Sequence, residues 1–588
     1  MTFTPPAVHT SRPTLRGTFG MAASTHWLAT ATAQSVLERG GNAFDAAAAG
    51  AFVLHVVEPH LNGPGGDLVG IFATAEAPGT PVVLMGQGPA PAAATIEHYR
   101  AEGLELVPGS GALAAAIPGA VDAWLLLLRD HGSWEPGAVL EYAIGYARDG
   151  HPVLERVRAT IDRVTELFAQ HWPTSAELWL SEGRAGAADV ATNPALADTF
   201  DRLAAAAVGE TRAQRIDAVR REWSEGFVAQ AIADFIRTPH RHSTGGDHAG
   251  VLTLGDLAGF RASFEPAVTA EFRGHTIAKS GAWGQGPALL QMLRLLDGLD
   301  DERLDPSTAL GAHTILEVEK LALADRDAYY GDAEVPLEHL LSEAYTADRR
   351  RLIADAASLE LRPGAVPGHT AFTPPLVASD SPGSGEPTVS RTGEMKGDTC
   401  HIDVVDRWGN VVAVTPSGGW LQSSPAIPGL GFCLGTRLQM TWLEPGAASS
   451  LAPGKRPRTT LTPTLVLRDG RAVEALGSPG GDQQDTWQLL YLLRRIVGGY
   501  EPQQAIDAPA FHSTSFADSF WPRTWQPGGA VVEDRLGEAV IGELVRRGHV
   551  ITRAGDWSLG RISMVGVDGA ERSAAANPRG NQGYASGR

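Results

Sequence analysis

The sequence predicts an α+β protein in which helical stretches and short β-hairpins occupy different parts of the chain. Three stretches carry apolar residues at helical spacing: residues 27–57, 110–235 and 313–330. Residues 401–415 and 464–476 each contain two strand-like runs joined by a Gly-Asn or an Asp-Gly pair, which is typical of a hairpin. A chain of 588 residues exceeds the usual size of one core, so we expect two or more closely packed lobes.

The N-terminal region is expected to contain two closely packed helices. Residues 27–39 form the first, and residues 43–57 form the second, which is rich in alanine because small side chains allow close helix packing. A glycine-rich loop at residues 58–67 leads to a strand at residues 68–74, and such a loop can approach a ligand or form a tight turn. Residues 110–235 show no recognisable chemistry and are expected to be helical scaffold.

Two polar stretches in the middle of the chain are interpreted as structural. His240, His242 and His248 lie in a glycine-containing segment without a cysteine or carboxylate at helical spacing, so we expect a solvated loop and not a metal site. A long helix is expected at residues 313–330. Its charged residues predict a charged face that crosses the molecule: Glu317, Glu319, Asp325, Arg326 and Asp327.

A change of composition falls at Thr399. Residues 362–398 are rich in proline, glycine, serine and threonine and are expected to form a mobile, exposed link, whereas a strand begins at once after Thr399. A cut between Asp398 and Thr399 would give one residue both a hydroxyl nucleophile and a free α-amine, a base with a pKa near ~8. Two alternatives are an ordinary strand threonine and a cut one residue later, which would expose the thiol of Cys400.

A second chemical signal is the glycine turn after the second hairpin. Residues 477–482 contain Gly480 and Gly481 and open an apolar helix at residues 486–497. Consecutive glycines at such a turn can direct main-chain N–H groups toward an anion, as an oxyanion hole requires. Residues 429–435 superficially resemble a dinucleotide-binding motif, but no strand and helix flank them, so we expect no cofactor.

Composition disfavours several classes of partner. The formal net charge of −19, without a basic cluster, disfavours nucleic acid and anionic membranes. The only cysteines, Cys400 and Cys433, provide neither a disulfide framework nor a zinc site. The first residues have no basic segment followed by an apolar one, and no long apolar run occurs. We therefore expect a cytoplasmic protein without metal or membrane span.

Short motifs occur in order along nearly the whole chain, from about Gly20 to residue 580. They lie at residues 40–47, 57–60, 63–66, 252–260, 286–292, 324–332, 399–406, 455–457, 477–481 and 508–512. Together they resemble the γ-glutamyltransferase family of N-terminal-nucleophile hydrolases. The resemblance implies a four-layer αββα sandwich and a precursor that cleaves itself before Thr399. Residues 1–398, with the link at 362–398, would be the large subunit, and residues 399–588 the small catalytic subunit of one heterodimer.

The resemblance also implies roles for individual residues. Thr399 matches the nucleophile, and Ser417 matches a threonine whose hydroxyl supports it. Gly480 and Gly481 match the glycines of the oxyanion hole. Three more residues match positions that bind the substrate, the first two as counterparts of a serine pair that holds its carboxylate: Thr459, Thr460 and Gln439.

The sequence departs from the family where the γ-glutamyl group would be held. Ile96 stands where an arginine grips the α-carboxylate, and Gly419 and Trp442 align with the asparagine and aspartate that meet the α-ammonium. Charge-assisted hydrogen bonds of this kind contribute about 1.5–3 kcal/mol each. Arg100, about one helical turn beyond Ile96, and Arg458 are candidates to replace the missing arginine.

We therefore expect an autoprocessing amidohydrolase or acyltransferase that acts on a small-molecule amide through an acyl-Thr399 intermediate. The departures favour an acyl group other than γ-glutamyl. Family members include γ-glutamyl hydrolases and transferases, cephalosporin acylases and an oxamate amidohydrolase. Two alternatives are a true γ-glutamyl hydrolase or transferase acting on glutathione-like compounds, and a binding homologue that has lost catalysis.

Overall fold

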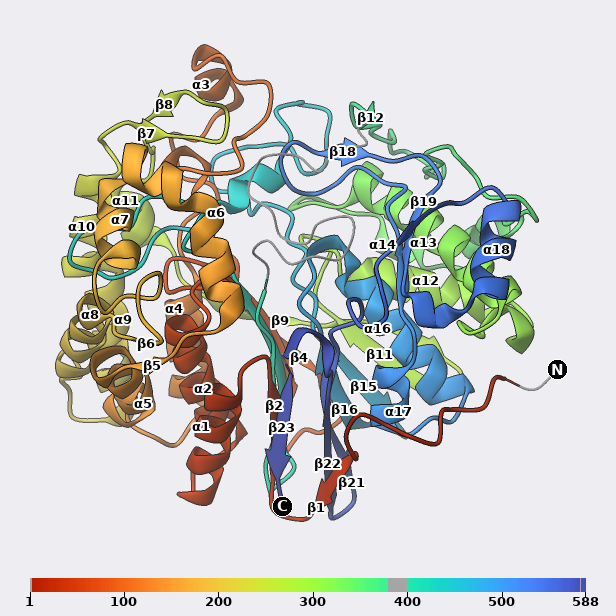
Figure 1. The fold of residues 1–588 in the computed structure, drawn as a ribbon, viewed down its shortest axis with the longest axis horizontal. Coiled ribbons are helices and arrows are strands. Elements are labelled where there is room, and N and C mark those ends of the chain that lie inside the picture. The colour runs from red at the N-terminus through yellow and green to blue at the C-terminus, as the bar shows by residue number, and fades with distance from the viewer. Residues whose placement is uncertain (1–2, 379–398, 582) are drawn as a thin grey trace.

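Two seven-stranded antiparallel sheets lie face to face at the centre of the molecule (Figure 1). The computed structural model describes residues 3–378, 399–581 and 583–588. The first sheet contains, in spatial order, β23 (Tyr584–Gly587), β2 (Met21–Ser24), β13 (Ile402–Val405), β14 (Val411–Ser417), β3 (Asp67–Ala73), β4 (Val82–Gly86) and β9 (Ser263–Pro266). The second contains β1 (Leu15–Gly17), β22 (Glu571–Ala576), β21 (Ser563–Asp568), β16 (Arg471–Gly477), β15 (Thr464–Arg468), β11 (His275–Lys279) and β10 (Val268–Phe272).

Helices cover the outer face of each sheet. The first sheet carries α1 (Trp27–Glu38), α2 (Ala43–Val57) and α4 (Ala120–His131). The second carries α12 (Pro287–Asp297), α16 (Gln484–Leu492) and α17 (Pro502–Asp507), with α13 (Ala309–Tyr329) packed on α12. The predicted four-layer αββα sandwich is therefore confirmed.

Both fragments of the expected cut contribute strands to both sheets. Residues before 399 supply β2, β3, β4 and β9 to the first sheet and β1, β10 and β11 to the second. Residues from 399 onward supply β13, β14 and β23 to the first and β15, β16, β21 and β22 to the second. The two fragments therefore interleave and do not form separate domains.

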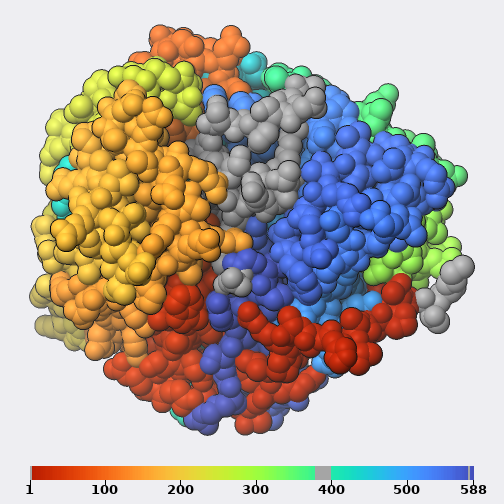
Figure 2. Space-filling model, viewed as in Figure 1, coloured from red at the N-terminus to blue at the C-terminus, as the bar shows by residue number. Residues whose placement is uncertain are grey.

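Scaffold elements flank the sandwich on both sides. On the side of the first sheet lie α3 (Ile96–Ala101), α5 (Pro136–Asp149), α6 (Glu155–His171), α7 (Pro173–Leu180), α8 (Pro194–Ala205), α9 (Arg212–Glu225), α10 (Phe227–Phe235), α11 (Leu254–Gly259), β5 (His151–Pro152), β6 (Val190–Ala191), β7 (His240–Arg241) and β8 (Asp247–His248). On the other side lie α14 (Leu337–Leu340), α15 (Glu343–Arg350), α18 (Glu538–Arg546), β12 (Val377–Ala378), β17 (Phe511–Ser513), β18 (Thr524–Trp525), β19 (Gly529–Val532) and β20 (Val550–Arg553). In Figure 2 the first group of elements gives the orange and yellow surface on the left, and the second group gives the blue and green surface on the right. Within the described residues, no helix is both long and apolar enough to cross a membrane.

The alanine-rich helix α2 explains how the first sheet is buried. All of its residues are buried, and Asn42 caps it by accepting hydrogen bonds from the N–H groups of Phe44 and Asp45. A Cβ atom on Gly50 would lie 2.6 Å from the side chain of Ile402 in β13. The close approach of helix and sheet therefore requires the small side chains that the sequence shows.

The long helix α13 differs from the expected charged face. Its residues from Gly311 to Tyr329 are buried, so its charged residues lie inside the protein, and most of them are paired there. Glu317 binds Lys320, and Asp325 binds Arg349. The helix is a central element of the second half of the structure, and its ion pairs compensate for the loss of water.

The first part of the expected mobile link is anchored. Arg362 binds Glu317, and Gly364 donates its N–H to Asp325 at 2.7 Å, so residues 362–378 begin as a segment held against α13. The remainder of the predicted link, residues 379–398, lies outside the described residues. The composition of the link could not reveal this anchor, because Glu317 and Asp325 lie 45 and 39 residues before the link residues that they bind.

Candidate functional site

Thr399 and Ser417 stand side by side at the ends of two neighbouring strands. Thr399 precedes β13 and forms a bridge with Ser417, the last residue of β14. Their hydroxyl oxygens lie 3.2 Å apart, and both residues are buried. The structure thus brings together the two residues that the resemblance pairs. Asp398, the other side of the predicted cut, lies outside the described part of the chain.

Polar side chains continue from Thr399 along the face between the two sheets. Alternation along β13 places Thr399, His401 and Asp403 on the same face. His401 contacts Thr415 through Nδ1 at 2.9 Å and Asp403 through Nε2 at 2.7 Å. Asp403 also accepts a hydrogen bond of 2.7 Å from Ser563 of the second sheet. Burial raises the pKa of Asp403, while His401 opposes that rise. The hydrogen bonds of His401 and Asp403 therefore connect the two sheets close to Thr399.

Cys400 points to the opposite face of β13. Its Sγ donates to Glu58 Oε2 at 3.0 Å and accepts from Asn62 at 3.1 Å. Thr25 donates to the same carboxylate oxygen at 2.6 Å. The contact with Glu58 uses the thiol proton, whereas a reactive cysteine needs the thiolate. The side chain of Cys400 is therefore engaged on the α2 side, away from the face that carries Thr399.

The predicted glycine turn lies at the end of β16. Gly480 and Gly481 have φ values of +136° and +53°, which residues with a side chain rarely adopt. A Cβ atom on Gly480 would also lie 2.3 Å from Trp487. Three residues earlier, Gly477 packs against the ring of His401. Since His401 is two residues from Thr399, the turn lies beside the start of β13.

A buried network of ion pairs and hydrogen bonds binds Asp482, the residue that follows the glycine turn. Asp482, which follows Gly481, accepts hydrogen bonds from Ser519 Oγ at 2.5 Å and from Arg326. Arg458 donates to Ser519 Oγ at 2.5 Å and to Asp327 at 2.9 Å. Arg458, proposed from the sequence as a substrate anchor, is thus already bound to a carboxylate.

The other predicted binding residues differ in how many partners they have. Thr459 Oγ1 accepts a main-chain N–H, whereas Thr460 Oγ1 is buried and has no hydrogen-bond partner in the described chain. Gln439 donates to Gly109 O at 3.2 Å and accepts from the N–H of Trp521 at 3.1 Å. Thr460 therefore retains a free hydrogen-bonding group, while the amide of Gln439 holds the surrounding loops.

Arg100 lies outside this cluster. It belongs to α3, at the upper edge of Figure 1, and its half-exposed side chain pairs with Glu444 at 3.1 Å. Ile96, at the start of the same helix, packs against a small apolar cluster. Within the residues that the structure describes, no contact joins Arg100 to Thr399, so replacement of the missing arginine by Arg100 would require it to leave Glu444.

Sequence reasoning did not find a buried ion pair beside Ser417. Asp67 is the strand partner of Ser417 and binds Arg437 through two contacts of 2.6 and 2.7 Å. A small cavity of about 10 Å³ adjoins this pair and also reaches Gln87 and Gly418. Arg437 stands 370 residues from Asp67, in a segment without a motif, so no local signal was available.

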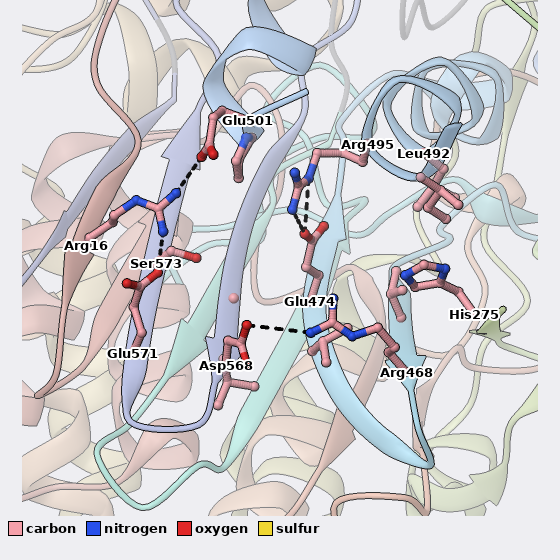
Figure 3. Close-up of a pocket in the computed structure, with 16 residues that line it drawn as sticks. Arg16, His275, Arg468, Glu474, Leu492, Arg495, Glu501, Asp568, Glu571 and Ser573 are labelled. Atoms are coloured by element: carbon pink, nitrogen blue, oxygen red, sulfur yellow. Dashed lines mark hydrogen bonds and ion pairs between the residues drawn. The ribbon is translucent and has the colours of Figure 1, made fainter. Parts of the chain in front are cut away.

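A second cavity, lined by charged residues, lies on the second sheet (Figure 3). It encloses about 300 Å³, and its arginines contact acidic residues of the same cavity. These pairs are Arg16 with Glu501 and Glu571, Arg495 with Glu474, and Arg468 with Asp568. Because its charged groups neutralise one another, this cavity gives no indication of a ligand.

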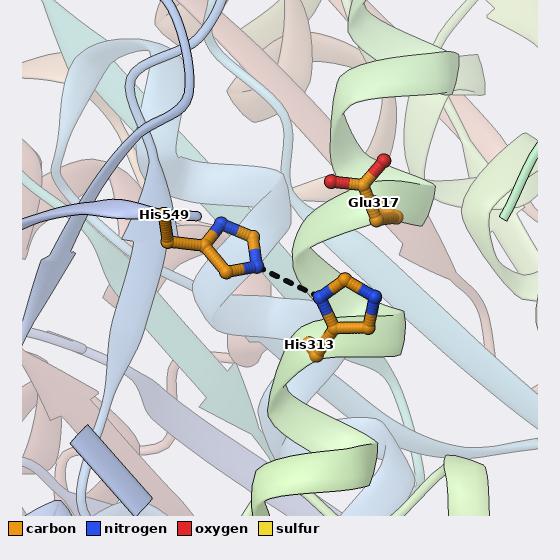
Figure 4. A group of neighbouring side chains, drawn as sticks. All are labelled: His313, Glu317 and His549. Carbon is orange, nitrogen blue, oxygen red and sulfur yellow. Dashed lines mark hydrogen bonds between the residues drawn. The ribbon is translucent and has the colours of Figure 1, made fainter. Parts of the chain in front are cut away.

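Three side chains of types that can bind a metal ion lie close together, and each of them already has a hydrogen-bond or ion-pair partner (Figure 4). His313 and His549 are 2.9 Å apart, between Nδ1 of the first and Nε2 of the second. Glu317 is bound by Lys320 at 2.7 Å and by Arg362 at 2.8 Å, so two cations already neutralise it. Burial lowers the pKa of His549 to about 2 and also lowers that of His313. The group is therefore a neutral histidine pair beside a satisfied carboxylate.

Two stacked antiparallel sheets between layers of helices are the architecture of the N-terminal-nucleophile hydrolases. The chain belongs to the gamma-glutamyltranspeptidase family, whose sequence model matches residues 29–587. It is 32% identical over 559 residues to the oxamate amidohydrolase proenzyme of Klebsiella pneumoniae, covering 92% of this chain and 93% of the relative. It is 27% identical over 576 residues to the glutathione hydrolase-like YwrD proenzyme of Bacillus subtilis, covering 96% and 98%.

A solved structure extends this similarity to the fold. The structure of LmbA2991HD has 52% sequence identity and a TM-score of 0.93, and the match covers 99% of this chain and 100% of that chain. Since the relatives are named hydrolases and proenzymes, the protein is an enzyme of this hydrolase family. The names of the relatives differ in substrate, so they leave the substrate of this chain open.

Proposed function

We propose that the protein cleaves itself before Thr399 and then acts as an amidohydrolase or acyltransferase. The observation that carries this proposal is the juxtaposition of Thr399 Oγ1 and Ser417 Oγ at 3.2 Å on the face between the sheets. In processing, the Thr399 hydroxyl attacks the preceding carbonyl carbon, the peptide C–N bond breaks, and water opens the resulting ester. The cut frees the α-amine of Thr399 and produces the two subunits.

In turnover, the freed α-amine accepts the proton of Thr399 Oγ1 while the oxygen attacks the amide of the substrate. The N–H groups of Gly480 and Gly481 stabilise the oxyanion of the tetrahedral intermediate. The leaving amine takes the proton as the C–N bond breaks and an acyl ester forms on Thr399. Water, or an acceptor amine, then attacks this ester and restores the enzyme.

The proposal includes Thr399, and not Cys400, as the nucleophile. The contact of Cys400 with Glu58 holds the thiol on the other face of the strand, which supports this choice. The two cysteines are buried and form no disulfide bond in the described part of the chain. We infer a cytoplasmic location from the sequence.

We also propose that the preferred acyl group is not γ-glutamyl. A side chain on Gly419 would be strained at a φ of +64°, and its Cβ atom would lie 2.9 Å from Gly66 N. Ile96 and Trp442 offer no charge to the carboxylate and ammonium of a glutamyl group. The free hydroxyl of Thr460 provides one hydrogen bond for another acyl group.

The experiment compares kcat/KM of the mature protein for a γ-glutamyl anilide, a glutaryl anilide and short neutral acyl anilides. We expect the γ-glutamyl compound to be the poorer substrate. A preference for it of about tenfold or more, about 1.4 kcal/mol, would instead identify a γ-glutamyl hydrolase, the activity suggested by the glutathione hydrolase-like relative. Absence of Thr399-dependent turnover across a broad amide screen would identify a binding homologue.

A further inference from the structure

A groove of about 600 Å³ lies beside the end of β4, at the same end of the first sheet as Thr399. Its lining includes the exposed residues Gly255, Arg261 and Gly454, so the groove is open to solvent there. Its inner end is formed by Gln87 and Ile117, which are buried. The groove therefore leads from the surface toward the interior at the end of β4.

The small cavity beside Asp67 and Arg437 adjoins the inner end of this groove. Gln87 and Ile117 line the small cavity as well as the groove, so their side chains form the boundary between the two spaces. The small cavity encloses about 10 Å³, which is about the space that one buried water molecule requires. A water molecule at this boundary would therefore lie between the groove and the Asp67–Arg437 pair.

Two polar groups of the residues that line the small cavity lack a strong hydrogen-bond partner in the described chain. Gln87 is 0% exposed, and its Nε2 donates to Gly88 O at 3.0 Å, which fixes the orientation of the amide. Its Oε1 accepts no hydrogen bond within the residues that the structure describes. Arg437 uses Nε and Nη2 for Asp67, whereas its Nη1 contacts the sulfur of Met440 at 3.6 Å, a weak acceptor. An acceptor and a donor are therefore available to a water molecule, which needs roughly two to four polar partners when buried.

The strand register places this cavity in line with the nucleophile. Thr399 is bridged to Ser417, and Ser417 is the strand partner of Asp67. The pairing of β3 with β4 continues the row to Gln87, beside Asp67. Paired residues of antiparallel strands point to the same face, so these four side chains share the face between the sheets. Neighbouring strands are about 4.8 Å apart, so Gln87 lies roughly 14 Å from Thr399 along this row.

The charged groups that line the groove already have partners. These are Arg456 with Asp332 at 2.8 Å and Glu265 at 2.6 Å, Arg261 with Glu225 at 2.9 Å, and Asp256 with the N–H groups of Ala92 and Thr253, each at 2.8 Å. The side-chain group without a partner at the inner end is the amide oxygen of Gln87, which is neutral. A neutral molecule that donates a hydrogen bond therefore suits the inner end better than an ion does.

We propose that the groove and the small cavity form a water-entry site, which supplies the water that hydrolyses the acyl ester on Thr399. Gln87 holds one water molecule in the small cavity, and the groove replaces it from solvent. This inference rests on the proposed function of Thr399 and concerns the second reactant of that function. Water that arrives along the row of strand ends reaches Thr399 by a path of its own, so the width of this path sets the share of hydrolysis against transfer to an amine.

Hydrolysis of the ester uses the oxygen of this water. The oxygen attacks the carbonyl carbon of the acyl ester, while the free α-amine of Thr399 accepts one proton of the water. The C–O bond to Thr399 Oγ1 then breaks, the same proton passes to Oγ1, and the acyl group leaves as a carboxylic acid. An acceptor amine that attacks the same carbon gives an amide instead, so water and amine compete for one intermediate.

The kinetic test measures how the acyl-enzyme of the mature protein divides between water and hydroxylamine, with the best anilide of the comparison above as substrate. We expect I117F, which narrows the boundary, to lower the ratio of hydrolysis to hydroxamate formation by about threefold or more, and I117A, which widens it, to raise the ratio. A loss of stability alone would move the two variants in the same direction. Q87L should behave like I117F, because leucine cannot accept a hydrogen bond. Q230L is the matched control, because Gln230 is exposed and bonds only to Asp234 in the described chain.

A crystal structure of the full-length T399A chain separates this inference from the proposed function. We expect an ordered water within hydrogen-bond distance of Gln87 Oε1 in T399A and its loss in T399A/Q87L. This result supports the water site even if T399A retains turnover, which would show that Thr399 is not the nucleophile. A small cavity without water at high resolution, or a ratio that is unchanged in I117F and Q87L or shifts the same way in I117F and I117A, overturns the inference even if Thr399 catalyses hydrolysis.

Discussion

Cys400 Sγ donates a hydrogen bond of 3.0 Å to Glu58, on the face of β13 opposite to the one that Thr399 occupies. Two adjacent residues with nucleophilic side chains are therefore directed to different environments. The Thr399 hydroxyl contacts Ser417 between the sheets, whereas the Cys400 thiol contacts the carboxylate of Glu58 at the C-terminal end of α2. This difference determines what each substitution should do.

Thr399→Ala should arrest both self-cleavage and amide turnover, whereas Cys400→Ala should mature and remain active. One hydroxyl performs both acyl transfers in our proposal, and the thiol takes part in neither. Intact-mass measurement of the small fragment and an anilide assay check both variants. Thr399→Ser is the conservative control and should retain part of each activity. Maturation of the alanine variant at Thr399, or a fragment that begins at Cys400, would reject the assignment.

Ser417→Ala should reduce kcat and leave KM nearly unchanged, because the hydroxyl contacts the nucleophile and not the substrate in our proposal. Loss of one hydrogen bond to a group that becomes charged corresponds to about 1.5–3 kcal/mol, or roughly tenfold to a hundredfold in rate. Ser417→Thr restores a hydroxyl and should restore most of the rate. An alanine variant with wild-type kcat would show that this contact has no part in turnover.

Gly480→Ala should reduce both activity and stability. The new Cβ atom would meet Trp487 at 2.3 Å, and a φ of +136° is unfavourable for alanine, with a cost on the order of 1–3 kcal/mol. Gly446→Ala is the matched control, because a Cβ atom there would contact nothing within 4 Å. Thermal unfolding and kcat are measured for both. Equal behaviour of the two variants would contradict the predicted role of the turn.

Glu319 should make the protein less stable as pH rises. Burial raises the pKa of this carboxyl from an ordinary 4.5 to about 8. Between these two values the unfolded chain has lost the proton that the folded protein still binds, so the free energy of unfolding falls with rising pH. The contribution of the Glu319 carboxyl to the free energy of unfolding is fully present below about pH 4.5 and is lost as pH rises toward 8.

Glu319→Gln should remove this dependence, because the amide cannot ionise and can still accept the N–H of Ser513, which donates to Glu319 at 2.8 Å. Unfolding of the two proteins is compared at pH 5 and pH 8. The variant should gain stability relative to the wild type at the higher pH. A difference between the two proteins that is the same at both pH values would mean that Glu319 is ionised throughout.

Local patterns in the sequence predicted the elements that carry the site. The hairpin at residues 401–415 appears as β13 and β14, and that at 464–476 as β15 and β16, because alternating side chains and tight turns are local signals. The alanine-rich stretch at 43–57 is α2, with the same bounds. The resemblance added the layer order, which local patterns alone do not contain.

Contacts between distant residues could not be predicted in this way. Arg458 and Arg100 have the charge of a substrate anchor, but Asp327 and Glu444 already bind them, and neither partner is close in sequence. The pairing of Asp67 with Arg437 and the stacking of Arg523 on Trp442 likewise depend on tertiary packing. Amino-acid type indicates which interactions a residue can make, whereas the fold determines which of them it makes.

The interleaving of the two fragments has a consequence for how the enzyme can be produced. Each sheet would contain strands of both polypeptides after the cut, so neither polypeptide could complete its backbone hydrogen bonds alone. Separate expression and mixing of residues 1–398 and 399–588 should therefore give aggregates, whereas the uncut precursor refolds. Once cut, a heat-denatured sample should not recover activity on cooling, and its durability would be governed by the rate at which it first unfolds.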